Sequence, residues 1–249
     1  MQTAGNPDPF LGDIIPYKFV PEILDLVVGA WCRIPRLKPN HLEPRITALL
    51  RRACIGEYEQ RYRGQAWPFI VTNEDQLTDP RTGRQVARTD LEVHIRSLNI
   101  PEQRPFFTFE AKRLNIPNRN RVRSNAAEYV GDGGMMCFVT SRYDPIFCGM
   151  LGYVMNGNIG TARVALAIAI GRKHRSLRLR HPKQLVLSSR LPNDNRYGET
   201  SHAGKTGEFT MHHLFLSRRT ASPRRSSKTG IWSPLQNLGK NSCYIAAHK

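Results

Sequence analysis

The chain has 249 residues, 40% of them hydrophobic, and its 37 lysines and arginines against 20 aspartates and glutamates give a net charge of +17. This hydrophobic content excludes wholesale disorder and suffices for the core of one large domain, with or without appended segments. So large a positive charge indicates a polyanionic partner, and nucleic acid is the first candidate.

The N-terminal part of the chain predicts two helices. Residues 1–20 are rich in proline, glycine and aromatic side chains, and we expect them to form an arm that packs on the rest. Pro21–Trp31 is typical of a short helix with proline in its first turn. Asn40 is a candidate N-cap for a long helix over His41–Tyr62, which carries Pro44 in its first turn. The apolar stripe of that helix consists of Leu42, Ile46, Leu49, Leu50 and Ala53.

The middle of the chain predicts extended structure. Trp67–Thr72 is rich in β-formers, and Asp79–Gly83 is a turn signal. Val86–Ile95 and Pro105–Leu114 are the expected central strands. The basic segment that follows, Asn115–Arg123, is expected to be a loop.

The next hundred residues predict further helices and strands. Ser124 is a candidate cap for a helix over residues 125–143, although the glycines of that segment disfavour a helix. Ile146–Val154 predicts a buried strand, and Thr161–Ile170 predicts a helix. Two more strands are expected at Gln184–Ser188 and Phe209–Leu216. This order favours an α/β fold with a central mixed sheet flanked by helices.

Three parts of the chain are distinguished by composition. Residues 1–39 form the arm and the short helix that packs on the core, and residues 40–217 form the main domain. No acidic residue follows Glu208, and residues 218–249 read as a basic, poorly ordered extension.

Cysteine usage and hydropathy exclude several classes of protein. The five cysteines are scattered and none forms a CxxC pair, so neither a disulfide framework nor a zinc ribbon is expected. The first residues lack the pattern of a secretory signal, and the longest apolar stretches are too short to span a bilayer. No basic amphipathic helix or lipidation signal indicates a membrane partner. We expect a cytoplasmic protein.

The stretch Thr89–Leu114 contains the pairing parts of the two central strands. Three of its charged residues could act together. Asp90 stands on the first strand, and Glu110, Ala111 and Lys112 are in the second. Because strand side chains alternate between faces, Glu110 and Lys112 project together while Ala111 turns away. If the strands pair, Asp90 lies beside Glu110. Two carboxylates are costly in a core, but their oxygens suit a divalent metal ion.

This pattern resembles the PD-(D/E)XK, or restriction-endonuclease-like, nuclease superfamily. In that family a helix with an acidic residue precedes a three-stranded meander with the aspartate and the (D/E)xK motif, followed by a helix and another strand. The same order is expected over residues 40–155, although Thr89 stands where the family often has a proline. The resemblance implies a restriction-endonuclease-like core and a metal-dependent endonuclease that prefers DNA to RNA, in phage defence or mobile-element biology.

The resemblance also implies roles for individual residues. Asp90 and Glu110, with the Ala111 carbonyl, would hold Mg²⁺, with Mn²⁺ as an alternative. Lys112 would position the attacking water and stabilise charge on the phosphate. Glu43 resembles an additional acidic residue on the first core helix, whereas its alternative is an ordinary first-turn glutamate favoured by the helix dipole. Weaker substitutes are Glu57, Glu59 and Glu92, and Glu128 and Tyr129 are further polar candidates.

Four arginines follow the motif: Arg113, Arg119, Arg121 and Arg123. Beside a phosphodiester site they predict nucleic-acid binding, and solubilising surface charge is the alternative. Homodimerisation and an activating protein partner are both compatible with such an enzyme.

The rival function is a non-catalytic, basic nucleic-acid-binding protein in which the ExK tripeptide is decayed or coincidental. Other chemistry finds little support in the sequence. His212 and His213 would point to opposite faces of a strand rather than share a metal ion. The glycines of Gly131–Gly134 have neither Walker nor Rossmann spacing.

Overall fold

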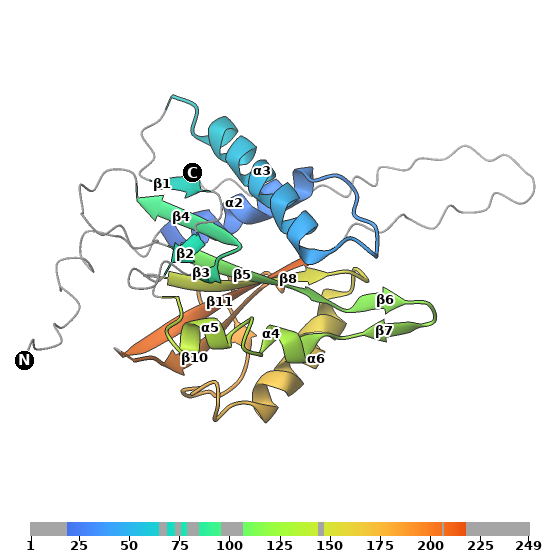
Figure 1. The fold of residues 1–249 in the computed structure, drawn as a ribbon, viewed down its shortest axis with the longest axis vertical. Coiled ribbons are helices and arrows are strands. Elements are labelled where there is room, and N and C mark those ends of the chain that lie inside the picture. The colour runs from blue at the N-terminus through green and yellow to red at the C-terminus, as the bar shows by residue number, and fades with distance from the viewer. Residues whose placement is uncertain are drawn as a thin grey trace, which may run out of the picture.

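A mixed β-sheet with helices on both faces forms the centre of the protein (Figure 1). The computed structural model describes residues 19–64, 69–72, 76–78, 85–95, 107–143, 147–205 and 207–217. In spatial order, the seven strands of the described sheet are β1 (Phe69–Thr72), β4 (Leu91–Ile95), β5 (Phe107–Leu114), β8 (Phe147–Val154), β11 (Glu208–Ser217), β10 (Tyr197–Ala203) and β9 (Val186–Leu187). The predicted α/β class is confirmed.

The strand directions divide this sheet into three parts. β1, β4 and β5 form an antiparallel meander. β5, β8 and β11 run parallel to one another, and the crossover between β5 and β8 contains two short helices. β10 and β9 add antiparallel strands at the far edge. β5 is therefore a central strand, as expected from its phenylalanines.

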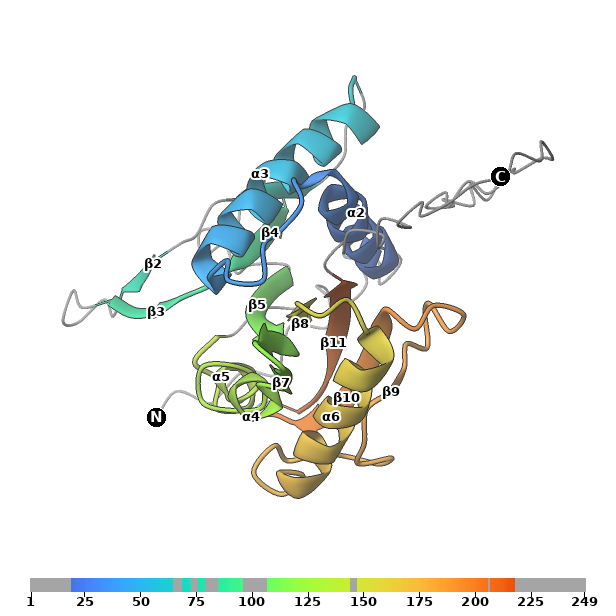
Figure 2. The ribbon, with the colours of Figure 1, turned by 90° about the vertical axis from the view of Figure 1, so that its right-hand side faces the viewer.

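Two helices cover one face of the sheet and three cover the other (Figure 2). α2 (Phe19–Arg33) and α3 (Glu43–Arg61) pack on the first face. The other face carries α4 (Ala126–Tyr129), α5 (Met136–Val139) and α6 (Ile159–Arg172), the last capped by the Asn158 side chain. Each fully buried large apolar side chain contributes about 1.5–3 kcal/mol to this packing.

The short N-terminal helix packs on the core as expected. In α2 the Trp31 ring stacks on Tyr153 of β8, with centroids 5.4 Å apart. The Trp31 indole N–H also donates to the Ser217 carbonyl at the end of β11, over 2.8 Å. These contacts fix α2 against two parallel strands.

Phe107 and Phe109 fill the centre of the core between α2, α3 and the sheet. Their rings stack with centroids 4.3 Å apart, and a Cβ on the neighbouring Gly149 would lie 2.7 Å from the Phe109 ring. A side chain at Gly149 would therefore displace an aromatic ring. Ala111 continues this face and is fully buried.

The expected strand Val86–Ile95 is wrong as a single element. β3 (Gln85–Arg88) pairs with β2 (Gln76–Thr78) in a separate ribbon, and only β4 joins the central sheet. Between them the Thr89 hydroxyl donates to Glu92 over 2.6 Å. This bond turns the chain at Asp90, so Asp90 precedes the strand instead of lying within it.

The segment after β5 is a two-stranded ribbon, not the expected loop. β6 (Ile116–Asn118) and β7 (Arg121–Arg123) pair antiparallel and project from the body of the protein (Figure 1). Asn115 and Arg119 have positive φ values of 48° and 50°. These two left-handed residues turn the chain at the base and at the tip of the ribbon.

The helix expected over residues 125–143 is also wrong. The chain forms only α4 and α5, separated by a glycine-rich turn in which the Met135 amide bonds to the Tyr129 carbonyl. A Cβ on Gly134 would lie 2.1 Å from that carbonyl oxygen. A residue with a side chain could not allow this approach, so the glycine breaks the helix.

Two details of the long helix α3 differ from expectation. It begins at Glu43 after Leu42, without a side-chain cap, so Asn40 is not its N-cap. Pro44 lies in the first turn as predicted. Leu42 is 63% exposed and does not belong to the buried stripe, which retains Ile46 and Leu50.

Several smaller predictions have clear outcomes. The strands β8, β9 and β11 and the helix α6 occur where expected. β10 was not predicted, because YGETSHA alternates poorly and its buried side chains other than Tyr197 are polar. The cysteines described are all free thiols: Cys32, Cys54, Cys137 and Cys148. No helix in the described ranges is long and apolar enough to cross a membrane. The arm before Phe19, the Asp79–Gly83 turn and the extension from Arg218 lie outside the described residues.

Candidate active site

The predicted site lies where the meander opens at one edge of β5. β4 pairs with β5 only as far as Phe109, whose carbonyl accepts from the Asp90 amide. Beyond that point two carboxylates replace the neighbouring strand. Asp90 Oδ2 accepts from the Ala111 amide over 2.8 Å, and Glu43 Oε2 accepts from the Arg113 amide over 3.0 Å.

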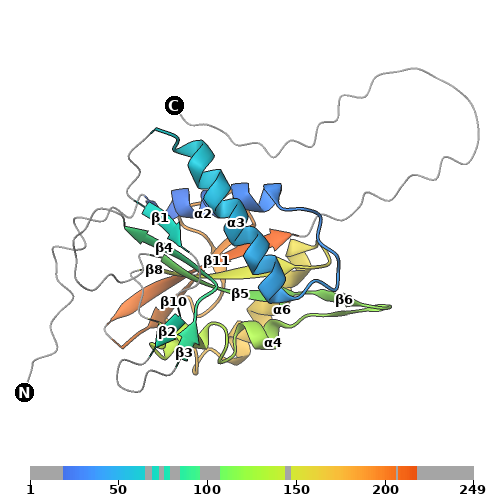
Figure 3. The same ribbon diagram turned by 45° about the horizontal axis from the view of Figure 1, so that its top comes forward.

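Lys112 joins the acids of this edge. Its Nζ donates to Glu110 Oε1 over 2.8 Å, to Glu43 Oε1 over 3.1 Å and to the Ala111 carbonyl over 2.7 Å. Glu43 can reach the lysine because the N-terminal end of α3 lies over β5 (Figure 3). Asp90, Glu110, Lys112 and Glu43, predicted as one group, are thus brought together.

The site is largely desolvated, and its members differ in exposure. The side chains of Glu110 and Lys112 are 9% and 13% exposed, whereas Glu43 is 25% exposed. Tyr143, after α5, donates its hydroxyl to Glu110 Oε2 over 3.2 Å. Both Glu110 oxygens are therefore held, and the members of the site with partly exposed surface are Glu43, Lys112 and Asp90.

Burial and mutual repulsion perturb the acids. Burial, followed by the charge of Asp90, raises the pKa of Glu110 to about 7. Burial also raises the pKa of Asp90, although the Ala111 amide and Lys112 oppose the shift. The pKa of Lys112 is raised by Glu110 and Glu43, against the effect of burial. Lys112 therefore stays charged, whereas burial favours the protonated forms of Glu110 and Asp90.

The charge of the cluster matches a divalent cation. When ionised, the three carboxylates and one ammonium carry a net charge of −2. No group of three or more histidine, cysteine or acidic side chains in the described residues is arranged to hold an ion. Magnesium is commonly held by one or two carboxylates plus water. The oxygens at this edge that could serve as such donors are those of Asp90, Glu110 and the Ala111 carbonyl, and Lys112 Nζ now bonds to Glu110 and to that carbonyl.

The four predicted arginines do not share one environment. Arg113 is half-buried, and its guanidinium donates to the His41 carbonyl over 3.1 Å. Arg123, at the base of the ribbon, pairs with Glu128 over 2.7 Å. Arg119 and Arg121 are exposed on the ribbon, away from the carboxylates. Among the residues described, Arg123 is thus the one of the four whose guanidinium is paired with a carboxylate.

The weaker candidates are placed outside the cluster. Glu57 is buried and pairs with Arg61 over 2.6 Å and with Arg33. Glu92 is buried between Thr89 and His94, and its contact with Thr89 holds the turn at Asp90. Glu59 is exposed on α3. None of the three substitutes for Glu43 or Asp90.

The polar candidates on α4 and β11 are also structural. Glu128 ties Arg123 and Asn125 at the base of the ribbon. Tyr129 is fully buried and its hydroxyl contacts His213 of β11. His212 and His213 lie on opposite faces as predicted, His212 against Phe107.

Tyr143 was not found from the sequence. It lies 33 residues after Glu110 in an irregular segment, and no local pattern identifies it.

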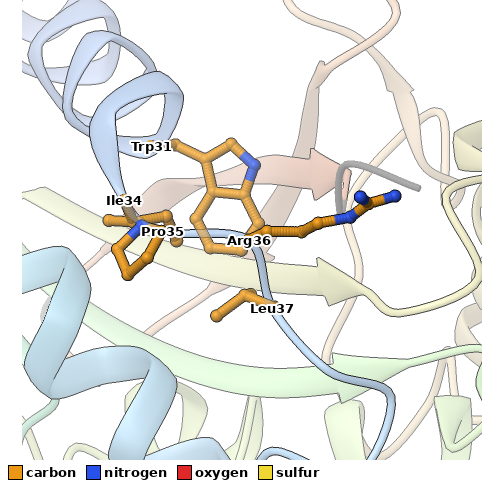
Figure 4. Close-up of a pocket in the computed structure, with 5 residues that line it drawn as sticks. All are labelled: Trp31, Ile34, Pro35, Arg36 and Leu37. Carbon is orange, nitrogen blue, oxygen red and sulfur yellow. The ribbon is translucent and has the colours of Figure 1, made fainter. Parts of the chain in front are cut away.

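A shallow hollow at the end of α2 is separate from the site. Its lining consists of Trp31, Ile34, Pro35, Arg36 and Leu37 (Figure 4).

Comparison with family models, curated proteins and solved structures finds no match to this chain. Function is therefore inferred from the chemistry of the site.

Proposed function

We propose that the protein is a Mg²⁺-dependent nuclease that hydrolyses phosphodiester bonds, with DNA as the preferred substrate and Mn²⁺ as an alternative ion. The observation that carries this proposal is the Lys112 ammonium, bonded to Glu110 and Glu43 at the strand edge where Asp90 caps the Ala111 amide. Each group has a counterpart in the chemistry of phosphodiester hydrolysis.

The order of elements supports a restriction-endonuclease-like core. A helix with an acidic residue, α3, precedes the meander β1-β4-β5, and a helical crossover leads to the parallel strand β8. The meander brings Asp90 and the Glu110–Lys112 motif to one edge. This arrangement is similar to that of the PD-(D/E)XK superfamily.

The acids would hold the metal ion and the lysine would act on the substrate. Asp90, Glu110 and the Ala111 carbonyl are the donors, and a bound divalent ion supplies charge stabilisation at the phosphate and a more acidic water. Lys112 orients the water and stabilises negative charge on the phosphate oxygens. Glu43 and Tyr143 are positioning residues, because they hold Lys112 and Glu110.

The charge of the whole chain favours a nucleic-acid substrate. The net charge of +17 attracts a polyanion over distances of about a Debye length. The acidic site would repel phosphate by itself, so the surrounding basic surface is needed to bring the backbone to it. A setting in phage defence or mobile-element biology is the corresponding biological proposal.

A cleavage assay tests this proposal. The purified protein is incubated with single-stranded and duplex DNA and RNA, with Mg²⁺, with Mn²⁺ and with chelator. We expect metal-dependent cleavage that Asp90→Asn abolishes and that Glu59→Gln, a change of an exposed acid on α3 outside the site, leaves intact. Binding of all substrates without cleavage under any metal condition would favour the non-catalytic rival.

A further inference from the structure

The ribbon formed by β6 and β7 is the most exposed basic element that the structure describes next to the site. Every residue from Asn118 to Ser124 is exposed, including Val122 at 53%. Among the described strands β6 and β7 pair only with each other, and the ribbon extends from the body in line with β5 (Figure 1). The ribbon is therefore available to contact a binding partner.

The two faces of the ribbon differ in chemistry. Cross-strand partners share a face, and the register pairs Asn118 with Arg121 and Pro117 with Val122. The Pro117–Val122 face is therefore apolar, whereas the other face carries Ile116 at the base and the amide and guanidinium groups of Asn118, Arg121 and Arg123. Asparagine and arginine are the side chains that most often bond to base edges, and Arg119 extends the polar set at the tip.

The ribbon is held rigidly at its base. The Asn115 amide donates to the Ser124 carbonyl over 3.0 Å, and the Asn115 side chain donates to the Thr161 hydroxyl in α6 over 2.9 Å. Asn115 is itself buried. Arg123 forms an exposed ion pair with Glu128 at this base. The tip arginines thus have a defined direction relative to Lys112.

We propose that this ribbon inserts into the major groove of B-form duplex DNA and thereby selects a double-stranded DNA substrate. Two strands about 4.8 Å apart, with their side chains, fit a groove about 12 Å wide. The deep, narrow major groove of A-form RNA does not admit them. Arg119 lies seven positions after Lys112, an extended reach of about 23 Å at most, so the same duplex can contact the ribbon and the site.

Binding without divalent metal tests the ribbon separately from cleavage. The double variant Arg119→Ala/Arg121→Ala should bind duplex DNA about a hundredfold more weakly, roughly tenfold for each arginine. Its affinity for single-stranded DNA should change much less. The matched control is Arg172→Ala/Arg175→Ala, two exposed arginines at the opposite end of α6. That control should weaken duplex binding less than about threefold.

This inference rests on the proposed function, and the outcomes of the binding and cleavage experiments keep the two apart. Equal losses in both double variants, or duplex RNA bound as tightly as duplex DNA, would overturn the ribbon's role even if the wild-type protein cleaves DNA. Selective loss of duplex binding supports the ribbon even if no cleavage is found.

Discussion

Asp90 is the residue at which stability and proposed activity conflict most clearly. Its carboxylate lies half-buried beside Glu110, and the Ala111 amide only partly offsets the cost of desolvation. Such a charge is expensive in the absence of a cation. Its retention is understandable if the cost is recovered in binding a metal ion.

We predict that Asp90→Asn abolishes cleavage. In the protein without metal, the same change should raise the free energy of unfolding by about 1 kcal/mol, because the asparagine oxygen still accepts from the Ala111 amide but carries no charge. Chemical denaturation at pH 8 measures this effect. The control is Asp194→Asn, since Asp194 pairs with Arg196 over 2.8 Å and its pKa is lowered. The control should lose stability. A destabilised Asp90→Asn would show that Asp90 is a structural acid.

The sequence could predict those residues of the site that follow from local geometry. Strand alternation places Glu110 and Lys112 together, and hairpin pairing brings in Asp90. Tyr143 could not be predicted, because its contact with Glu110 depends on the path of the chain after α5.

At the scale of elements, the glycine turn between α4 and α5 positions the crossover that carries Tyr143. Gly134 packs directly on the Tyr129 carbonyl, whereas a Cβ on Gly133 would have no neighbouring atom within 4 Å. Of these two adjacent glycines, Gly134 therefore occupies a position with no room for a side chain, whereas Gly133 does not.

Gly134→Ala should lower the free energy of unfolding by about 1–3 kcal/mol, because the new methyl group cannot fit against backbone. Gly133→Ala should be close to neutral. Thermal or urea unfolding of both variants provides the measurement. Equal effects would mean that the turn is not tightly packed.

The elements that the sequence predicted correctly are those with a strong hydrophobic signal. β8, β11 and α6 are apolar and were found, whereas β10 buries Glu199, Thr200 and His202 and was missed. The break at Thr89 depends on one side-chain hydrogen bond to Glu92. Such polar contacts between distant or adjacent residues leave no periodic signal.

At the scale of the whole molecule, a buried polar chain links four segments across the sheet. The His202 Nδ1–H donates to the Leu177 carbonyl over 2.7 Å, so its Nε2 accepts from the Thr200 hydroxyl over 2.7 Å. Thr200 then accepts from His213 Nε2 over 2.9 Å, and His213 Nδ1 accepts from Tyr129 over 3.0 Å. This order of protons requires both histidines to be neutral.

The protein should therefore lose stability in mild acid. Burial lowers the pKa of His202 from 6.5 to about 4. Between these values the unfolded chain binds more protons, so the free energy of unfolding falls as the pH drops from 6.5 to 4, by about 3 kcal/mol for this residue.

Urea unfolding from pH 7.5 to 4.5 measures this dependence. His202→Gln should flatten the pH profile, while His174→Gln, a half-buried histidine bonded only to the Gly171 carbonyl among the contacts described, should not. An unchanged slope in His202→Gln would contradict the neutral chain.

The most direct test of the proposed function compares cleavage with binding in Lys112→Ala. Its ammonium is one of many positive charges on a chain of net charge +17, so duplex DNA affinity should stay within about threefold of the wild type. The single-turnover cleavage rate with Mg²⁺ should fall by at least about a hundredfold. A variant that binds and cleaves like the wild type would contradict a role for Lys112 in catalysis.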